Sequence, residues 1–137
     1  MAVAKDPNNP ALRNAQGKML DELGETEKAH AAYDAAIAAN PNYFDAYYNK
    51  AVVYHNHAVI LHDQAVEAKT NAEYETKKNL ADEEFARSIP LFEKALELNP
   101  GERSAMETLK TLYFRLRTKY PEMEAKHDAM VKRLEQE

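Results

Sequence analysis

The stretch Ala36-Ile37-Ala38-Ala39-Asn40-Pro41-Asn42 (residues 36–42, AIAANPN) has two counterparts elsewhere in the chain. Residues 2–8 read AVAKDPN, and residues 95–101 read ALELNPG. Each version has alanine, a branched aliphatic residue, two variable residues, Asp or Asn, proline, and Asn or Gly. The residue before a proline avoids the α region, and proline cannot continue the helical hydrogen bonds. Each version therefore predicts the end of a helix, and the recurrence predicts a chain built of repeats.

The spacing of these helix ends predicts the length of one repeat. Ala2 and Ala36 are 34 residues apart, and Ala36 and Ala95 are 59 apart, which is 34 plus 25. A 34-residue period with a helix-turn-helix pattern is a signature of helical solenoids. The sequence therefore predicts stacked helical hairpins, with a 25-residue insertion in the second complete unit.

Residues inside the units share a pattern of small and large side chains. The first complete unit has Gly17 and Leu20, then Ala29, Tyr33, Ala36 and Pro41; the second has Tyr47, Ala51 and Tyr54, then Ser88, Phe92, Ala95 and Pro100. This pattern resembles the tetratricopeptide repeat (TPR) family. The resemblance implies an all-α, TPR-like helix-turn-helix solenoid in which each hairpin buries its apolar face against the next one.

The repeat boundaries follow from the helix ends and from the resemblance. We expect a single TPR-like domain over residues 1–137, which divides into a remnant of a preceding repeat (1–9), repeat 1 (10–43), repeat 2 with the insertion (44–102), and a degenerate repeat 3 with a capping helix (103–137). The capping helix is expected from about Pro121 to Glu135. We also expect the chain to be the C-terminal part of a longer array.

The insertion itself reads as helix. No Gly or Pro occurs between Tyr54 and Ser88, and small residues recur at coiled-coil spacing at Ala51, Ala58 and Ala65. If both helices of repeat 2 share the insertion, each gains about 12 residues and the hairpin protrudes by roughly 18 Å. Residues 70–73 (TNAE) form an S/T-x-x-E capping box, which places the turn at 69–72. The sequence therefore predicts an elongated middle hairpin.

The charge and composition exclude several classes of function. The net charge is −5 with acidic and basic residues interspersed, which argues against a nucleic-acid or anionic-membrane partner. No cysteine is present, and no apolar run approaches the roughly 20 residues that span a bilayer. We expect a soluble protein without membrane insertion, in a cytoplasmic or periplasmic compartment that the sequence does not specify.

Chemistry-bearing motifs are also missing. His55, His57 and His62 lie close in sequence, but they lack the spacing of three or four that zinc ligands on one helix prefer. No glycine-rich phosphate loop and no nucleophile elbow occur. The sequence therefore predicts no enzyme activity, no metal and no cofactor.

The TPR resemblance implies a concave groove that binds a peptide or helix of a partner protein and is lined by the first helix of each unit. The predicted groove residues are Asn14, Lys18, Tyr48, Asn49, Val52, His55 and Asn56. Tyr48 and Asn49 are the central pair, because an amphipathic ring and an amide can hold a peptide backbone. The alternative for Tyr48 is that it packs against the neighbouring unit.

Two further functions stay open. The apolar residues Val59, Ile60 and Val66 on the protruding hairpin predict a surface for self-association, unless they are isolated surface residues of no consequence. The TPR resemblance also allows a co-chaperone-type clamp for a terminal carboxylate, to which Asn14 and Lys18, in swapped order, and Asn49 would contribute. Ser104 and Thr108 stand where the clamp has basic residues, and nearby acidic side chains would repel a carboxylate.

Overall fold

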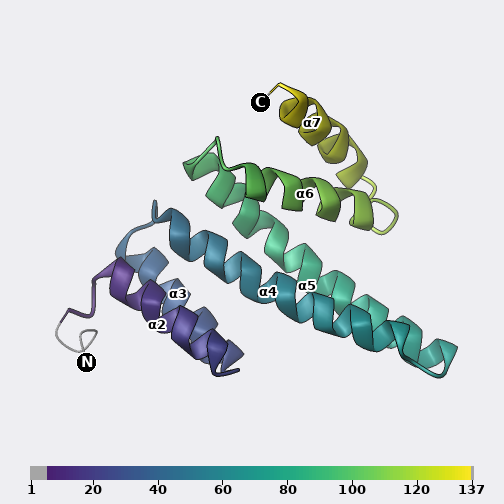
Figure 1. Ribbon diagram of the computed structural model, residues 1–137, viewed down its shortest axis with the longest axis horizontal. Coiled ribbons are helices and arrows are strands. Elements are labelled where there is room, and N and C mark those ends of the chain that lie inside the picture. The colour runs from purple at the N-terminus through teal and green to yellow at the C-terminus, as the bar shows by residue number, and fades with distance from the viewer. Residues whose placement is uncertain (1–5, 137) are drawn as a thin grey trace.

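The computed structural model describes residues 6–136, and within that range it contains six α-helices and no strand (Figure 1). The helices are α2 (Pro10–Glu22), α3 (Thr26–Ala39), α4 (Phe44–Val66), α5 (Asn71–Leu98), α6 (Arg103–Leu116) and α7 (Met123–Glu135). The predicted all-α, TPR-like class with an elongated middle hairpin is confirmed. Most of the remnant predicted at 1–9, namely residues 1–5, lies outside the described residues.

Consecutive helices form three antiparallel pairs: α2 with α3, α4 with α5, and α6 with α7. The middle pair is the longest, with 23 residues in α4 and 28 in α5. Figure 1 shows this hairpin between the other two pairs, with its turn extending beyond both of them. The turn end of the middle hairpin therefore has no neighbouring pair on either side.

The first pair illustrates why small residues are needed between these helices. A Cβ atom on Gly17 of α2 would lie 2.6 Å from Cε1 of Tyr33 in α3, so only glycine allows this approach. Gly24 makes the turn between the two helices with a φ of +78°, a conformation that favours glycine. The side chain of Asn9 caps α2 by accepting a hydrogen bond of 3.2 Å from the backbone of Leu12.

The buried residues form two clusters that meet at α4. The smaller cluster joins α3 to the first half of α4 and consists of Ala29, Tyr33, Ala36, Ala46 and Val53. The larger one joins α4, α5, α6 and α7, and its bulky members are Phe85, Ile89, Phe92, Leu96, Met106, Leu109, Leu112, Tyr113, Leu116, Met130 and Leu134. Because α4 contributes to both clusters, it is the helix through which the three pairs are joined.

The distal half of the hairpin is packed differently. Its buried apolar residues are alanines: Ala58 and Ala65 on α4 and Ala81 on α5 are almost fully buried. Tyr74 near the start of α5 is 38% exposed. Alanines hold the two helices close together, and such a seam has no room for a tyrosine ring.

Two boundaries differ from the sequence prediction. Helix α4 ends at Val66 and α5 begins at Asn71, so the link comprises residues 67–70 and not 69–72. Thr70 caps α5 as expected by accepting a hydrogen bond of 3.1 Å from Glu73 N, while the Glu73 carboxylate accepts from the backbone of Lys69 at 3.2 Å. The final helix begins at Met123 and not at Pro121, because the backbone first turns around Tyr120, whose carbonyl accepts from Met123 N at 2.9 Å.

Candidate partner-binding surface

The seven predicted groove residues lie on two first helices, α2 and α4, and they differ in exposure. Lys18 and Asn56 are exposed, whereas Asn14 is buried. The remaining four, Tyr48, Asn49, Val52 and His55, are half-buried. A surface made from all seven residues is therefore not available to a partner, and each half-buried residue has contacts within the chain.

Asn14 and Asn49 are bonded to one another. The Nδ2 group of Asn49 on α4 donates a hydrogen bond of 3.0 Å to Oδ1 of Asn14 on α2. Because Asn14 is buried, this bond satisfies a polar group that would otherwise be costly to remove from water. It fixes the register between α2 and α4, the first helices of the first two units. A carboxylate clamp would require the same Asn49 amide for its ligand.

Tyr48 links α4 to the third unit. Its hydroxyl lies 2.7 Å from Oγ of Ser104, the second residue of α6. Its ring packs edge-on against Phe92 of α5 and stacks on Phe44, with centroid distances of 5.6 and 5.5 Å. These are the contacts of a residue that packs against the neighbouring unit, the alternative that the sequence left open.

Val52 and His55 pack against the larger core cluster. Val52 is one of its partly buried members. The ring of His55 meets Phe85 and Phe92 edge-on, at centroid distances of 5.4 and 6.2 Å. Burial, and secondarily the charge of Arg115, lowers the pKa of His55 below its ordinary value of 6.5. His55 is therefore largely neutral near pH 7.

The first helices expose several polar side chains. Besides Lys18 and Asn56, they include Asp45 at the start of α4 and Thr111 on α6. No hydrogen bond or ion pair joins Lys18 or Asn56 to another of the described residues 6–136. A lysine, an amide, a carboxylate and a hydroxyl can therefore all bond to the backbone or side chains of a peptide.

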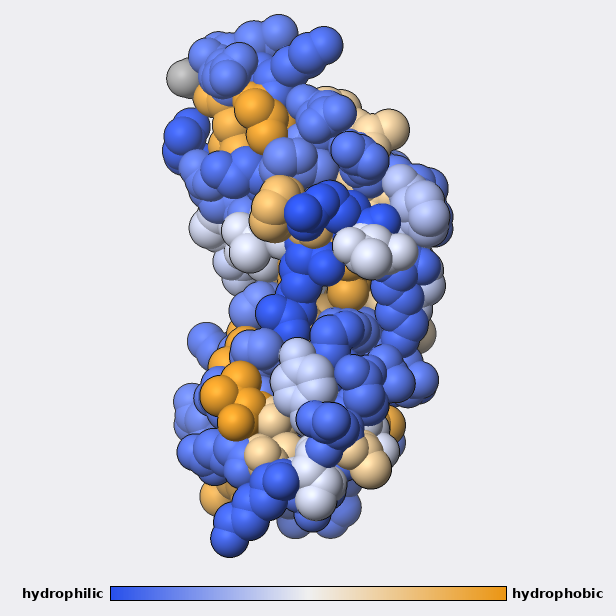
Figure 2. All heavy atoms as spheres, turned by 90° about the vertical axis from the view of Figure 1, so that its right-hand side faces the viewer, coloured by the Kyte–Doolittle hydropathy of each residue, from blue (hydrophilic) through white to orange (hydrophobic). Residues whose placement is uncertain are grey.

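The distal hairpin exposes apolar side chains. Val59, Ile60 and Val66 are 39%, 54% and 66% exposed, respectively. The structure adds two residues of α5 that the sequence analysis did not assign to this surface, Tyr74 and Leu80. Figure 2, which views the molecule from the side of the hairpin turn, shows apolar side chains in separate small groups among polar ones. This face of the molecule carries no single continuous apolar patch.

A buried charged cluster lies where α6 meets the hairpin, and the sequence analysis did not identify it. Asp82 of α5 is buried, with its carboxylate 3.2 Å from Lys78 Nζ and 3.7 Å from Arg115 Nε of α6. Arg115 also donates a hydrogen bond of 2.9 Å to Nδ1 of His62 on α4. A signal was present in the sequence, because Asp82 lies three residues before Phe85 on the apolar face of α5.

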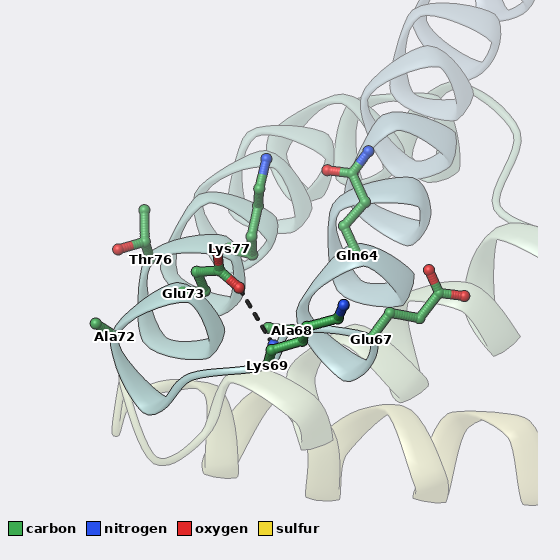
Figure 3. A pocket seen from close by; sticks show the side chains of 8 residues that line it. All are labelled: Gln64, Glu67, Ala68, Lys69, Ala72, Glu73, Thr76 and Lys77. Carbon is green, nitrogen blue, oxygen red and sulfur yellow. Dashed lines mark hydrogen bonds between the residues drawn. The ribbon is translucent and has the colours of Figure 1, made fainter.

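Two cavities lie elsewhere on the hairpin. One, of about 560 Å³, lies at its turn and is lined from the end of α4 and the start of α5, as Figure 3 shows. The other, of about 620 Å³, separates α3 from α4 and α5. Two pairs of its lining residues are in contact, Lys50 with Asp34 at 2.6 Å and His57 with Glu84 at 3.2 Å.

The described residues form neither a metal site nor a membrane-spanning helix. Over residues 6–136, no group of three or more His, Cys, Asp or Glu side chains is placed to hold a metal ion. In the same range, none of the helices combines the length and the apolar character that crossing a membrane requires.

Comparison with known proteins finds a repeat family and several solved structures. Residues 17–57, from the middle of α2 to the middle of α4, match the family model described as TPR repeat. The structure described as "MamA RS-1 ArsTM double mutant" is 26% identical, with 98% of this chain and 79% of that chain covered and a TM-score of 0.38. "MamA 41-end from Desulfovibrio magneticus RS-1" is 24% identical, with 98% and 80% covered and a TM-score of 0.39. Among curated proteins, no match is found.

Proposed function

We propose that this chain, whose residues 17–57 are TPR repeat sequence, is a protein–protein interaction scaffold. The partner contributes a peptide or a helix, which lies along the exposed sides of the first helices α2, α4 and α6. The TPR repeat is a scaffold that is typically non-catalytic, and the proposal includes no chemical step.

The match to the TPR repeat model carries this proposal, and the pattern of exposure supports it. The polar side chains of Asn14, Tyr48 and Asn49 are engaged in contacts between units, so they hold the first helices in register. Lys18 of α2 and Asn56 of α4 remain exposed on the same helices. We therefore propose that the residues in contacts between units shape the surface, and that Lys18 and Asn56 contact the partner.

A peptide-display library selected on the immobilised full chain tests this proposal. Peptides that bind the wild type should bind Asn56→Arg at least about tenfold more weakly, because a bulky cation replaces an amide in the contact surface. The matched control is Glu83→Arg, since Glu83 is also exposed and lies on the second helix α5. Equal losses in both variants, or no loss in Asn56→Arg, would contradict the assignment of the first-helix side.

Self-association through the distal hairpin is the second candidate, and it rests on the exposure of Val59, Ile60 and Val66. It predicts a concentration-dependent mass in sedimentation equilibrium for the full chain. Replacing Val59 and Val66 by Glu should then give a monomer at every concentration, while Asn79→Glu, an exposed polar position on α5, should leave the association unchanged. A wild type that stays monomeric throughout would dismiss this candidate.

A further inference from the structure

We propose that acidification loosens α6 and α7 from the long hairpin, and that His62 and His55 of α4 are the residues that sense it. His62 accepts a hydrogen bond from Arg115 of α6, and His55 packs against Phe85, the ring that Arg115 also contacts. The two histidines are seven residues apart and lie on one face of α4. This response to pH lies at the boundary between the second and third units, and it does not depend on which partner the chain binds.

The hydrogen bond to His62 requires a neutral ring. Arg115 Nη2 lies 2.9 Å from His62 Nδ1, and a guanidinium can only donate. The Nδ1 atom must therefore be the unprotonated acceptor, with the proton on Nε2. A second proton on the ring would place an N–H group against an N–H group and a cation against a cation, so protonation replaces an attractive contact by a repulsive one.

His55 lies deeper in the same boundary. Its ring meets Phe85 and Phe92 of α5, which offer no acceptor for an additional proton. Burial, with the charge of Arg115 second, keeps its pKa below the ordinary 6.5. The folded chain therefore binds a proton here less readily than the unfolded chain does. Its contribution to stability is complete above pH 6.5 and is lost as the pH falls below that value.

The surrounding charges do not offset an added proton. Helix α5 contributes one buried carboxylate, Asp82, and it is already shared between Lys78 at 3.2 Å and Arg115 at 3.7 Å. Helix α6 contributes Arg115 itself, which lies 4.5 Å from the ring of Phe85 and has no hydrogen-bond acceptor at Nε. On α4, Asp63 follows His62 but is exposed to water. The cluster is thus net positive before either histidine is charged.

The other contacts of the hairpin lack this sensitivity. In the distal seam between α4 and α5, the buried apolar residues are Ala58, Ala65 and Ala81, which do not titrate. His57 has a carboxylate partner, Glu84 at 3.2 Å, so its protonation adds an attraction. Acid is therefore expected to act at the boundary between α4 and α6 and to leave the distal seam between α4 and α5 intact.

Distances between spin labels test the proposal. The chain has no cysteine, so pairs introduced by mutation are the sole labelling sites. The reporting pair is Gln64→Cys on α4 with Lys119→Cys after α6, and the control pair is Gln64→Cys with Glu83→Cys inside the hairpin; all three positions are exposed. Measurements are made at pH values of about 7.5 and about 5.5, one unit on either side of the ordinary pKa of histidine.

Acidification should broaden the reporting distribution and shift it to longer distances, while the control distribution stays unchanged. In a chain carrying His55→Phe and His62→Gln, which keeps an acceptor for Arg115, the acid shift should disappear. His62→Gln alone should reduce it, so the proposal stays testable if the double variant does not fold. An unchanged reporting distance in the wild type, or the same acid shift in the histidine variants, would overturn the proposal.

Discussion

Both halves of the long hairpin are formed by α4 and α5, but different side chains hold the two helices together in each half. The proximal half, α4 from Phe44 to His55 with α5 from Phe85 to Leu98, lies between the first and third pairs and buries large side chains against both. The distal half buries alanines, and its turn lies beyond both neighbours. Helix α6 reaches only the base of this half, where Arg115 contacts His62 and Asp82. Its helices are held by close approach to one another, with little apolar area to contribute.

This difference teaches which contacts the repeat architecture supplies and which it does not. A TPR-like unit buries its apolar face against the next unit, so the proximal half gains stability from stacking. The inserted residues extend past the stack and must be stable as a two-helix pair. Small residues meet that requirement, because they allow many backbone contacts without large side chains that would be left exposed.

The largest expected effect is the loss of Phe92 from the proximal half. Phe92 is almost fully buried and contacts both Tyr48 and His55. Phe92→Ala should lower the free energy of unfolding by about 3–5 kcal/mol, the cost of a large cavity in a core. Urea denaturation followed by circular dichroism measures this. A loss below about 1 kcal/mol would mean that the proximal half does not depend on stacked large side chains.

The next effect sharpens the contrast in the distal half, where adding volume should be harmful. Ala58 is fully buried in the seam, so Ala58→Leu should separate the helices and cost about 1–3 kcal/mol. Ala72→Leu is the matched control on the exposed side of α5, where the same change should stay within about 0.5 kcal/mol. Equal effects at the two positions in thermal or urea denaturation would show that the seam is loosely packed.

A smaller loss is expected at the turn of the hairpin. Thr70→Ala removes the side-chain acceptor that caps α5 through Glu73 N at 3.1 Å, which should cost about 1 kcal/mol. The loss should be confined to the first turn of α5. Backbone chemical shifts by NMR should show fraying over residues 71–75 while residues 85–98 keep their helical shifts. Changes that reach the proximal half would mean that the two halves unfold together.

The smallest effect is expected on the distal surface. Val66 is 66% exposed, so Val66→Glu should change the free energy of unfolding of the dilute chain by no more than about 0.5 kcal/mol. A loss above about 2 kcal/mol, measured by urea denaturation at low protein concentration, would show that Val66 is buried in the folded state.

Periodicity in the sequence predicted the helices, the long hairpin and its alanine seam at Ala51, Ala58 and Ala65, because these depend on local spacing. It did not predict how side chains of different units meet. The contacts of Asn14 with Asn49, of Tyr48 with Ser104, and of His62 with Arg115 join residues 35, 56 and 53 positions apart.

Such contacts depend on how far one hairpin is shifted along the next. The repeat period does not fix this shift to within one helical turn. For this reason, several residues assigned to a groove on α2 and α4 are engaged between the units. The binding role of the exposed remainder, Lys18 and Asn56, stays a prediction.

Native-state hydrogen exchange along α5 tests the central contrast most directly, because one continuous helix passes through both halves. We predict that amides of residues 75–80 are protected at least about tenfold less than those of residues 88–96, which corresponds to about 1.4 kcal/mol in the free energy of opening. Equal protection over both segments would contradict the account, since it would show that the distal half is held as firmly as the stacked half.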